Sequence, residues 1–359
     1  MNNLEIKRMV YKKAYKIINS LKRKVGKDFQ SKSNSILVGS HNYPNVNAGV
    51  LSYVTKPSER SGVMEVLLER AKVVNSAKKV LVRNPIDFDE IVLSERPVDV
   101  EIFLRKEPTF SLNLSKFTRP ILISAKLEKF KVVENPKIKQ SVEKIINDEM
   151  KSTDAIIELS KHTSVEKISE ILSAGLMGKK KKMVPTRWSI TATDDILSKH
   201  NIDKIKSYDE IDEFYMFHRV FFDNEFLIML YPSQWGFEMV ESWGAEPSVD
   251  YEFYHGRKKY ASSIEGAYYA ARLSVTNYLM KIKRQAACSV FRLVHKGYFA
   301  PLGVWVIRDG VKKSFEQKMK FPSLNQMKSF VIEHYRAFEP FFDKSRMARY
   351  ISQRKLIDF

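Results

Sequence analysis

The sequence predicts an α+β fold in which mixed sheets are flanked by helices. Some segments alternate apolar and polar residues, as strands do, while others repeat apolar residues every three or four positions, as helices do. The two kinds of segment follow one another without a regular βαβ repeat, which is typical of α+β proteins. The chain has 359 residues, enough for one large or two ordinary domains, and 44% are hydrophobic, so a substantial core is expected.

A basic amphipathic helix is expected at residues 1–27, before the globular part. Apolar side chains recur there at spacings of three and four and form one face: Tyr11, Ala14, Ile18, Leu21 and Val25. Lysines and arginines cover the rest of its surface. A helix of this kind lies on a membrane, along nucleic acid, or on the body of its own protein with a solvated face. The sequence leaves these three alternatives open.

The first half of the globular part is expected to alternate between strands and helices. Residues 98–105 have a clear strand pattern, because Val98, Val100, Ile102 and Leu104 occupy every second position. In chain order, the expected elements are a polar linker at 28–35, a buried strand at 36–39, a turn-rich loop at 41–49, a helix around 62–79, strands at 98–105 and 121–130, and helices at 138–160 and 164–174.

The second half is expected to contain a hairpin and a long apolar-faced helix. Two strand-like runs, 214–222 and 225–231, flank Asp223 and Asn224, which are common turn residues. Ser262 and Glu265 have the spacing of a capping box, and a helix is expected to begin there and to reach residue 282. The remaining expected elements are paired strands at 286–294 and 303–308 and helices at 323–338 and 344–351.

The net charge of +19, from 61 basic and 42 acidic residues, favours a polyanionic partner. Each cation that meets a phosphate releases condensed counterions, so nucleic acid, DNA above all, is the first candidate. A solubility surface is the simpler alternative, and RNA or an anionic membrane surface would suit the basic helix. The single cysteine, Cys288, excludes an intrachain disulfide and a Cys-rich zinc site.

The sequence also predicts where the protein resides. No apolar run approaches the roughly 20 residues that span a bilayer, so no membrane partner is expected. The N-terminal segment lacks the apolar region and cleavage site of a signal peptide. We therefore expect a cytoplasmic protein, associated with the nucleoid if DNA is its partner.

A run of lysines is the first candidate for contact with DNA. Four adjacent lysines repel one another and stay solvated unless an anion neutralises them. Arg187 and Trp188 follow soon after, and an exposed Trp beside an Arg is suited to stack on an unpaired base. The alternative is a buried Trp188, with Arg187 paired to Asp194 or Asp195. The complete set of expected DNA contacts is Lys179, Lys180, Lys181, Lys182, Arg187, Trp188, Arg257, Lys258 and Lys259.

Several acidic residues are candidates for metal-dependent hydrolysis of a phosphodiester. Glu238 and Glu241 would share one face if their segment is a helix. Asp250 and Glu252 would share one face if their segment is a strand. Paired carboxylates beside basic groups hold Mg²⁺ or Mn²⁺ in such enzymes. The alternative is that these acids cap helices or pair with the surplus of basic residues. No P-loop is present, so no NTP hydrolysis is expected. The candidates are Asp194, Asp195, Glu238, Glu241, Asp250, Glu252 and His255.

The last residues, 349–359, resemble the tail peptide that docks on the sliding clamp PCNA. Gln353, Leu356 and Phe359 have the spacing Q-x-x-L-x-x-F, and Ile357 lies within the expected contact. A single helical turn would bring the apolar side chains to one side, where they can enter a hydrophobic pocket. The fullest form of the motif has two aromatics, so an affinity on the order of micromolar is expected. The alternative is a final helical turn that packs Leu356 on the body.

Motifs in one fixed order resemble those of the archaeal Nre family. The longest is VPTRWSITATDD, residues 184–195. The others are residues 38–39 with 43–49, 96–101, 135–138, 172–178, 236–243, 250–252, 267–272, 284–286 and 301–305. The resemblance implies a role in DNA damage repair, recruitment by PCNA, and a two-part architecture.

On that resemblance, the expected parts are the basic helix at 1–27, a family N-terminal domain at 28–250, a C-terminal domain at 251–348, and the clamp-binding tail at 349–359. Many family members have a Cys-rich, zinc-ribbon-like segment before the first motif. This chain has the basic helix there instead. Any property of relatives that depends on zinc is therefore in doubt for this chain.

Overall fold

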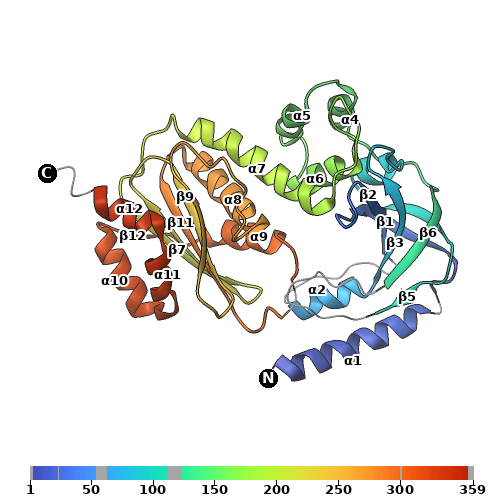
Figure 1. Ribbon diagram of the computed structural model, residues 1–359, viewed down its shortest axis with the longest axis horizontal. Coiled ribbons are helices and arrows are strands. Elements are labelled where there is room, and N and C mark those ends of the chain that lie inside the picture. Colours follow the sequence, from blue (N-terminus) through green and yellow to red (C-terminus); the bar gives the residue numbers. More distant parts are fainter. Residues whose placement is uncertain (1–2, 23, 54–62, 112–122, 300, 355–359) are drawn as a thin grey trace. The chain divides into compact units, whose positions relative to one another are not determined.

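The computed structural model describes residues 3–22, 24–53, 63–111, 123–299 and 301–354. The chain forms two compact units, and the division falls inside the long helix α7 (Thr186–Ile205). Unit 1 contains residues 1–196 and 299–301, and unit 2 contains residues 197–298 and 302–359. Both units combine helices with a six-stranded sheet (Figure 1). This confirms the predicted α+β fold in two parts. The predicted domain boundary after residue 250 stays a prediction.

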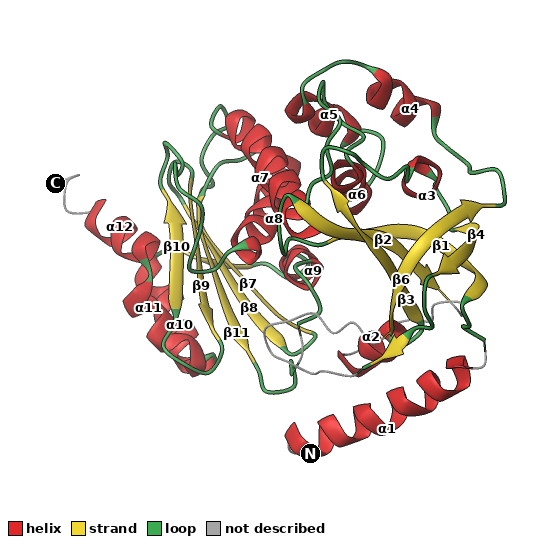
Figure 2. Cartoon of the chain, turned by 45° about the vertical axis from the view of Figure 1, so that its right-hand side comes forward, coloured by secondary structure: helices red, strands yellow, loops and turns green. Residues whose placement is uncertain are grey.

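The sheet of unit 1 closes into a barrel of five strands (Figure 2). β1 pairs antiparallel with both β2 and β4, and β2 pairs antiparallel with β3. β6 pairs antiparallel with β4 and parallel with β3, which completes the ring. A two-residue strand, β5, adds to β6. The bounds are β1 Asp28–Val38, β2 Asn45–Tyr53, β3 Val73–Leu81, β4 Val98–Leu104, β5 Thr109–Phe110 and β6 Ile123–Val132.

Side chains alternate across the barrel wall, because successive residues of a strand point to opposite faces. The four apolar residues predicted for the strand at 98–105 are all buried, as expected: Val98, Val100, Ile102 and Leu104. On β2, Val46, Ala48 and Val50 are buried in the same way. The interior is thus filled by side chains, as in other small barrels.

Seven helices, α7 included, begin in the described part of unit 1. They are α1 Asn3–Lys22, α2 Val63–Arg70, α3 Asp89–Leu93, α4 Gln140–Asn147, α5 Ser152–Leu159, α6 Val165–Ala174 and α7. The predicted apolar face of α1 is mostly confirmed, since Ala14, Ile18 and Leu21 are buried. Tyr11 is instead exposed. α1 packs along α2, so it lies on the body of unit 1 (Figure 1).

The sheet of unit 2 has the order β10-β9-β11-β8-β7-β12 and carries helices on both faces (Figure 1). One core joins it to α8, α9 and the end of α7, and a second core joins it to α10, α11 and α12. The strands are β7 Phe214–Phe221, β8 Asn224–Tyr231, β9 Gly236–Ser242, β10 Ser248–Glu252, β11 Ala287–Val294 and β12 Met319–Phe321. The helices are α8 Gly266–Ile282, α9 Trp305–Ser314, α10 Leu324–His334, α11 Glu339–Lys344 and α12 Arg346–Arg354, with a 3₁₀ turn at Arg336–Phe338.

The predicted hairpin is confirmed: β7 and β8 pair through a tight turn in which Phe222 and Asp223 have positive φ. Five other local predictions were wrong. Residues 45–49 of the expected loop at 41–49 are the first part of β2. Residues 28–35 are no linker but the first part of β1, and the expected helix at 62–79 ends at Arg70, where β3 soon replaces it. Residues 303–308 lead into helix α9. Glu265 has a positive φ and makes no capping bond, so α8 begins at Gly266 without a capping box.

Candidate nucleic-acid interface

Two exposed aromatic rings lie against each other on the surface of unit 1. Tyr43 comes from the loop between β1 and β2, and Trp188 comes from the first turn of α7. Their ring centroids are 5.0 Å apart and tilted by 51°. Tyr43 is 39% exposed and Trp188 is 45% exposed. The alternative of a buried Trp188 is therefore wrong, and a face of large aromatic area is open to a planar ligand.

Hydrogen bonds fix the start of α7 beside the barrel. The hydroxyl of Thr186 accepts from the backbone N–H of Val38, at the end of β1, with an N···O distance of 2.9 Å. The hydroxyl of Ser173, in α6, donates to the carbonyl oxygen of Val184 at 2.8 Å and bonds the Thr186 hydroxyl at 3.1 Å. The motif VPTRW thus holds Trp188 in one place because its own neighbours are tied to β1 and α6.

The four lysines predicted to contact DNA lie between α6 and α7 in the chain, and the Lys181 ammonium donates to the Ile146 carbonyl oxygen at 3.4 Å. All of Lys179, Lys180, Lys181 and Lys182 are exposed. The Lys182 ammonium lies 5.3 Å from the centre of the Tyr43 ring, a cation–π distance. Arg187, next to Trp188, is exposed as well. The structure therefore brings the lysine run and the aromatic pair into one surface, which we call the Lys-Trp surface: Tyr43, Lys179, Lys180, Lys181, Lys182, Arg187 and Trp188.

Backbone contacts hold the end of the lysine run in position. The N–H of Met183 donates to the carbonyl oxygen of Val82 at 2.9 Å, and the N–H of Val82 donates to the carbonyl oxygen of Pro44 at 3.0 Å. Gly175 ends α6 in the left-handed conformation, with φ of 80°. A Cβ at Gly175 would lie only 2.6 Å from the Lys182 carbonyl carbon, so only glycine permits this close approach.

The basic residues predicted in unit 2 have a different setting. Arg257 forms an ion pair with Asp250 at 2.9 Å and donates to the carbonyl oxygens of Lys259 and Tyr260, so it holds its own loop together. Lys258 and Lys259 are exposed. His255 is also exposed. Because the Arg257 side chain is bonded within its own loop, Lys258 and Lys259 are the two of these three basic residues that remain exposed, as a phosphate contact requires.

Glu238 is buried in β9 and acts as a cap. Its carboxylate accepts hydrogen bonds from the Ser289 hydroxyl at 2.6 Å, from the Ser345 hydroxyl, and from the backbone N–H groups of Arg346 at 2.7 Å and Met347 at 3.0 Å. The last two belong to the first turn of α12, whose N–H groups lack partners within the helix. Burial raises the pKa of Glu238, and these hydrogen bonds oppose that shift.

The other acids of β9 and β10 also have separate partners. Asp250 accepts from Arg257 and from two backbone N–H groups at 2.9 Å each. The Glu252 carboxylate pairs with Arg272 at 2.7 Å and accepts from the indole N–H of Trp235 at 3.3 Å. Glu241 pairs with Arg292. The alternative reading, in which these acids cap helices and pair with basic residues, describes what these four carboxylates do.

The faces of the sheet also separate these acids. Because β9 is a strand rather than a helix, Glu238 and Glu241 point to opposite faces. Glu238 lies on the face of the α10–α12 core with Val240, whereas Asp250 and Glu252 pair opposite Met239 and Phe237, which belong to the α8 core. In unit 1, Asp194 is buried and Asp195 is half-buried on α7. Within the described residues, no three His, Cys, Asp or Glu side chains are grouped as metal ligands.

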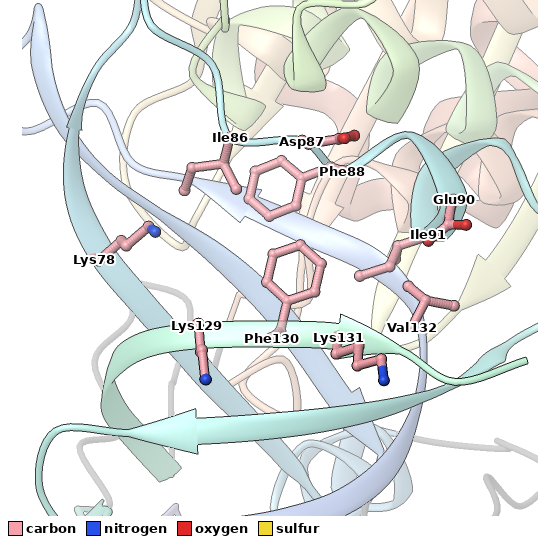
Figure 3. Close-up of a pocket in the computed structure, with 10 residues that line it drawn as sticks. All are labelled: Lys78, Ile86, Asp87, Phe88, Glu90, Ile91, Lys129, Phe130, Lys131 and Val132. Atoms are coloured by element: carbon pink, nitrogen blue, oxygen red, sulfur yellow. The ribbon is translucent and has the colours of Figure 1, made fainter.

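A pocket of about 390 Å³ opens at one end of the barrel in unit 1 (Figure 3). Figure 3 shows Phe88 and Phe130 facing each other across it, with ring centroids 5.7 Å apart and nearly parallel. Lys129 and Lys131 lie on its rim, but their ammonium groups point away from the rings. Its lining combines apolar side chains with charged groups of both signs, so the pocket favours neither a purely apolar ligand nor a phosphate.

The predicted clamp-binding tail lies mostly outside the described residues. Gln353 is exposed in the last turn of α12, while Leu356, Ile357 and Phe359 belong to residues 355–359, which are not described. The helices in the described part of the chain are all too short or too polar to cross a membrane.

Sequence reasoning missed Tyr43 as a partner of Trp188. Tyr43 was part of a motif, but its contact with Trp188 joins two segments that are far apart in the chain. An exposed Trp in a basic segment was the only local signal. The second ring and the cation over it depend on how α7 meets the barrel.

Comparison with known proteins matches nearly the whole chain. The family model "Archaeal Nre, N-terminal" matches residues 7–248, and "Archaeal Nre, C-terminal" matches residues 252–359. The "DNA repair protein NreA" of Archaeoglobus fulgidus is 34% identical over 310 residues, 79% of each chain. That of Haloferax volcanii is 32% identical over 80% of this chain and 78% of its own. The "DNA repair protein NreB" of A. fulgidus is 31% identical over 90% of each chain. No solved structure matches.

Proposed function

We propose a function in DNA repair for this chain, which belongs to the archaeal Nre family. It binds DNA through the Lys-Trp surface of unit 1. The family membership supports the repair role, since the similar proteins of A. fulgidus and H. volcanii carry that name. The exposed Tyr43–Trp188 pair beside four exposed lysines carries the DNA-binding role, because it offers a base a ring to stack on and offers the backbone cations.

A gapped duplex is the sharpest probe, because it contains both paired and unpaired DNA. Fluorescence anisotropy would compare the full chain with a Tyr43→Ala, Trp188→Ala variant at one fixed, low salt concentration. Loss of one stacked base predicts a fall in affinity of about 5- to 150-fold. Tyr251→Ala is the matched control, since Tyr251 is also 39% exposed but lies in unit 2.

Two results would overturn this part of the proposal. The first is a wild-type chain that does not bind gapped DNA even in dilute buffer. The second is an aromatic variant that binds as tightly as the Tyr251→Ala control. Circular dichroism of both variants would show whether the fold is kept.

The tail recruits the protein to the PCNA sliding clamp in this proposal. The Q-x-x-L-x-x-F spacing and the exposure of Gln353 support it. Calorimetry with the clamp would compare the full chain with a form that ends at Ile351. We expect a dissociation constant on the order of micromolar for the full chain and no measurable binding for the shortened form. Equal affinities of the two forms would remove the tail from the proposal.

A further inference from the structure

The connectivity of the barrel in unit 1 is that of the OB-fold. Its five long strands pair in the order β1-β2-β3-β6-β4 and return to β1. All neighbours are antiparallel except β3 and β6, and helix α3 stands between β3 and β4 in the chain. Five-stranded Greek-key barrels of this type bind oligonucleotides or oligosaccharides on the face of their second and third strands, beside the loop that joins the first two. Because a fold alone does not identify a ligand, the ligand class has to be inferred from the side chains on that face.

The outer face of β2 and β3 is polar and basic at the end near the Lys-Trp surface. Asn47 pairs opposite Lys79, and both are exposed, as is Asn45. The next outward pair, Gly49 and Ala77, is small. A Cβ at Gly49 would lie 1.8 Å from the Ser76 carbonyl oxygen, so β2 and β3 approach each other closely there. Gly49 itself is buried, so the exposed part of this face consists of the amide groups of Asn45 and Asn47 and the ammonium group of Lys79.

This face continues into the Lys-Trp surface through short connections. β2 begins at Asn45, two residues after Tyr43, and the end of β3 is joined through Val82 to Pro44 and Met183. Lys79, Asn47, Asn45, Tyr43 and Lys182 therefore follow one another along one side of unit 1. Cations occur at both ends of this path and an aromatic pair lies within it.

We infer that this path, from Lys79 on β3 to Lys182 and Trp188, is a binding site for single-stranded DNA. The inference rests on the proposed function and names its substrate class. Stacking on an exposed ring needs an unpaired base, because the faces of paired bases are covered by their neighbours in a duplex. The amides of Asn45 and Asn47 can bond bases or sugars, and the lysines can neutralise phosphates. The lysines favour this polyanion over a neutral oligosaccharide.

The test compares a labelled oligothymidylate of about 15 nucleotides, close to the upper site size of one such barrel, with a blunt duplex of similar length. The full chain is expected to bind the single strand at least about tenfold more tightly than the duplex. An Asn47→Ala, Lys79→Gln variant is expected to lose affinity for the single strand by about tenfold and to change little on the duplex. Lys131→Gln is the matched control, since Lys131 is an exposed lysine on β6 of the same barrel.

The outcomes separate this inference from the function on which it rests. If the oligothymidylate and the duplex bind equally well and the Asn47, Lys79 variant behaves like Lys131→Gln, the single-strand site is wrong and the DNA-binding function stands. If no DNA binds, both are wrong. Tighter binding of an oligouridylate than of the oligothymidylate would also overturn the assignment, because it would make RNA the ligand. Quenching of tryptophan fluorescence by the oligothymidylate in the wild type, but not in the Trp188→Phe variant, would support the single-strand site.

Discussion

Arg272 and Glu252 form a buried ion pair in unit 2, and each side chain is only 1% exposed. Arg272 also lies over the rings of Tyr268 and Tyr269. Two charges removed from water are tolerated only when each compensates the other. This pair therefore belongs to the core of unit 2, although Glu252 was a candidate for metal-dependent catalysis on the sequence alone.

Replacement of Glu252 by Ala should destabilise the protein by about 3–5 kcal/mol, because Arg272 would keep its buried charge without its partner. Urea unfolding followed by circular dichroism would measure the loss. Asp99→Asn is the control: its ion pair with Lys32 is largely exposed and should contribute about 1 kcal/mol or less. Equal effects of the two substitutions would contradict the structural role of Glu252.

Glu225 lies between two histidines and gives the hairpin a dependence on pH. His218 and His295 approach its two carboxylate oxygens at 2.8 and 2.7 Å. The hydrogen bond from His218, followed by the one from His295, lowers the pKa of Glu225 below its usual 4.5. A lowered pKa means that the folded state binds this proton less readily than the unfolded state. The stabilisation is therefore present above pH 4.5 and lost as the pH falls through the lowered value.

Glu225→Gln should remove this titration. The free energy of unfolding of the wild type should exceed that of the variant most above about pH 5, and the difference should shrink as the pH falls below about 4.5. Urea unfolding of both proteins at a series of pH values would provide the two curves. A difference that stays constant across this range would show that Glu225 contributes through packing alone.

At the level of elements, local sequence patterns identified those strands and helices that are determined by residues close together in the chain. β4 was predictable because its apolar residues alternate. The β7–β8 hairpin was predictable because Asp223 and Asn224 are of residue types common in turns, although the turn falls one residue earlier, at Phe222 and Asp223. The first part of β1, residues 28–35, was mistaken for a linker because its outward side chains are polar. Those side chains pair across strands: Lys32 with Asp99, and Gln30 with Glu101. Such partners are distant in the sequence, so no local pattern reveals them.

The candidate sites likewise could be predicted only where they depend on neighbouring residues in the sequence. The exposed lysine run could be predicted because adjacent like charges stay in solvent wherever the fold places them. The acids of β9 and β10 could not be separated from catalytic pairs, because the sequence does not show which face of the sheet each one occupies. The partnership of Tyr43 with Trp188 depends on the closed barrel, which the sequence did not predict.

The Gly175 turn connects α6 to the Lys-Trp surface, and Gly175→Ala should disturb both. An alanine in the left-handed conformation costs about 1–2 kcal/mol, and the clash with the Lys182 backbone should add about 1–3 kcal/mol. Gly244→Ala separates the two effects, since Gly244 has φ of 84° but no atom near its would-be Cβ. Thermal unfolding should show the larger loss for Gly175→Ala. A loss equal to that of Gly244→Ala would mean that the Lys182 segment shifts freely.

At the scale of the whole molecule, a net charge of +19 attracts any polyanion, so affinity alone does not locate a site. The dependence of affinity on salt is more informative. Each phosphate of a single strand that a protein cation neutralises adds about −0.7 to the slope of log affinity against log salt concentration. A change in that slope therefore counts the cations that a variant has removed from the interface.

Replacing Lys179, Lys180, Lys181 and Lys182 by Gln should make this slope less steep by about 2–3, if all four meet phosphates. Anisotropy titrations of oligothymidylate at several salt concentrations would measure it. The control removes the same charge from unit 2 by Lys→Gln changes at Lys281, Lys296, Lys312 and Lys328, all exposed. That control should lower the affinity slightly through the overall field and leave the slope nearly unchanged. Equal slopes for the two variants would mean that the lysine run acts through net charge, and the Lys-Trp surface would lose its phosphate contacts.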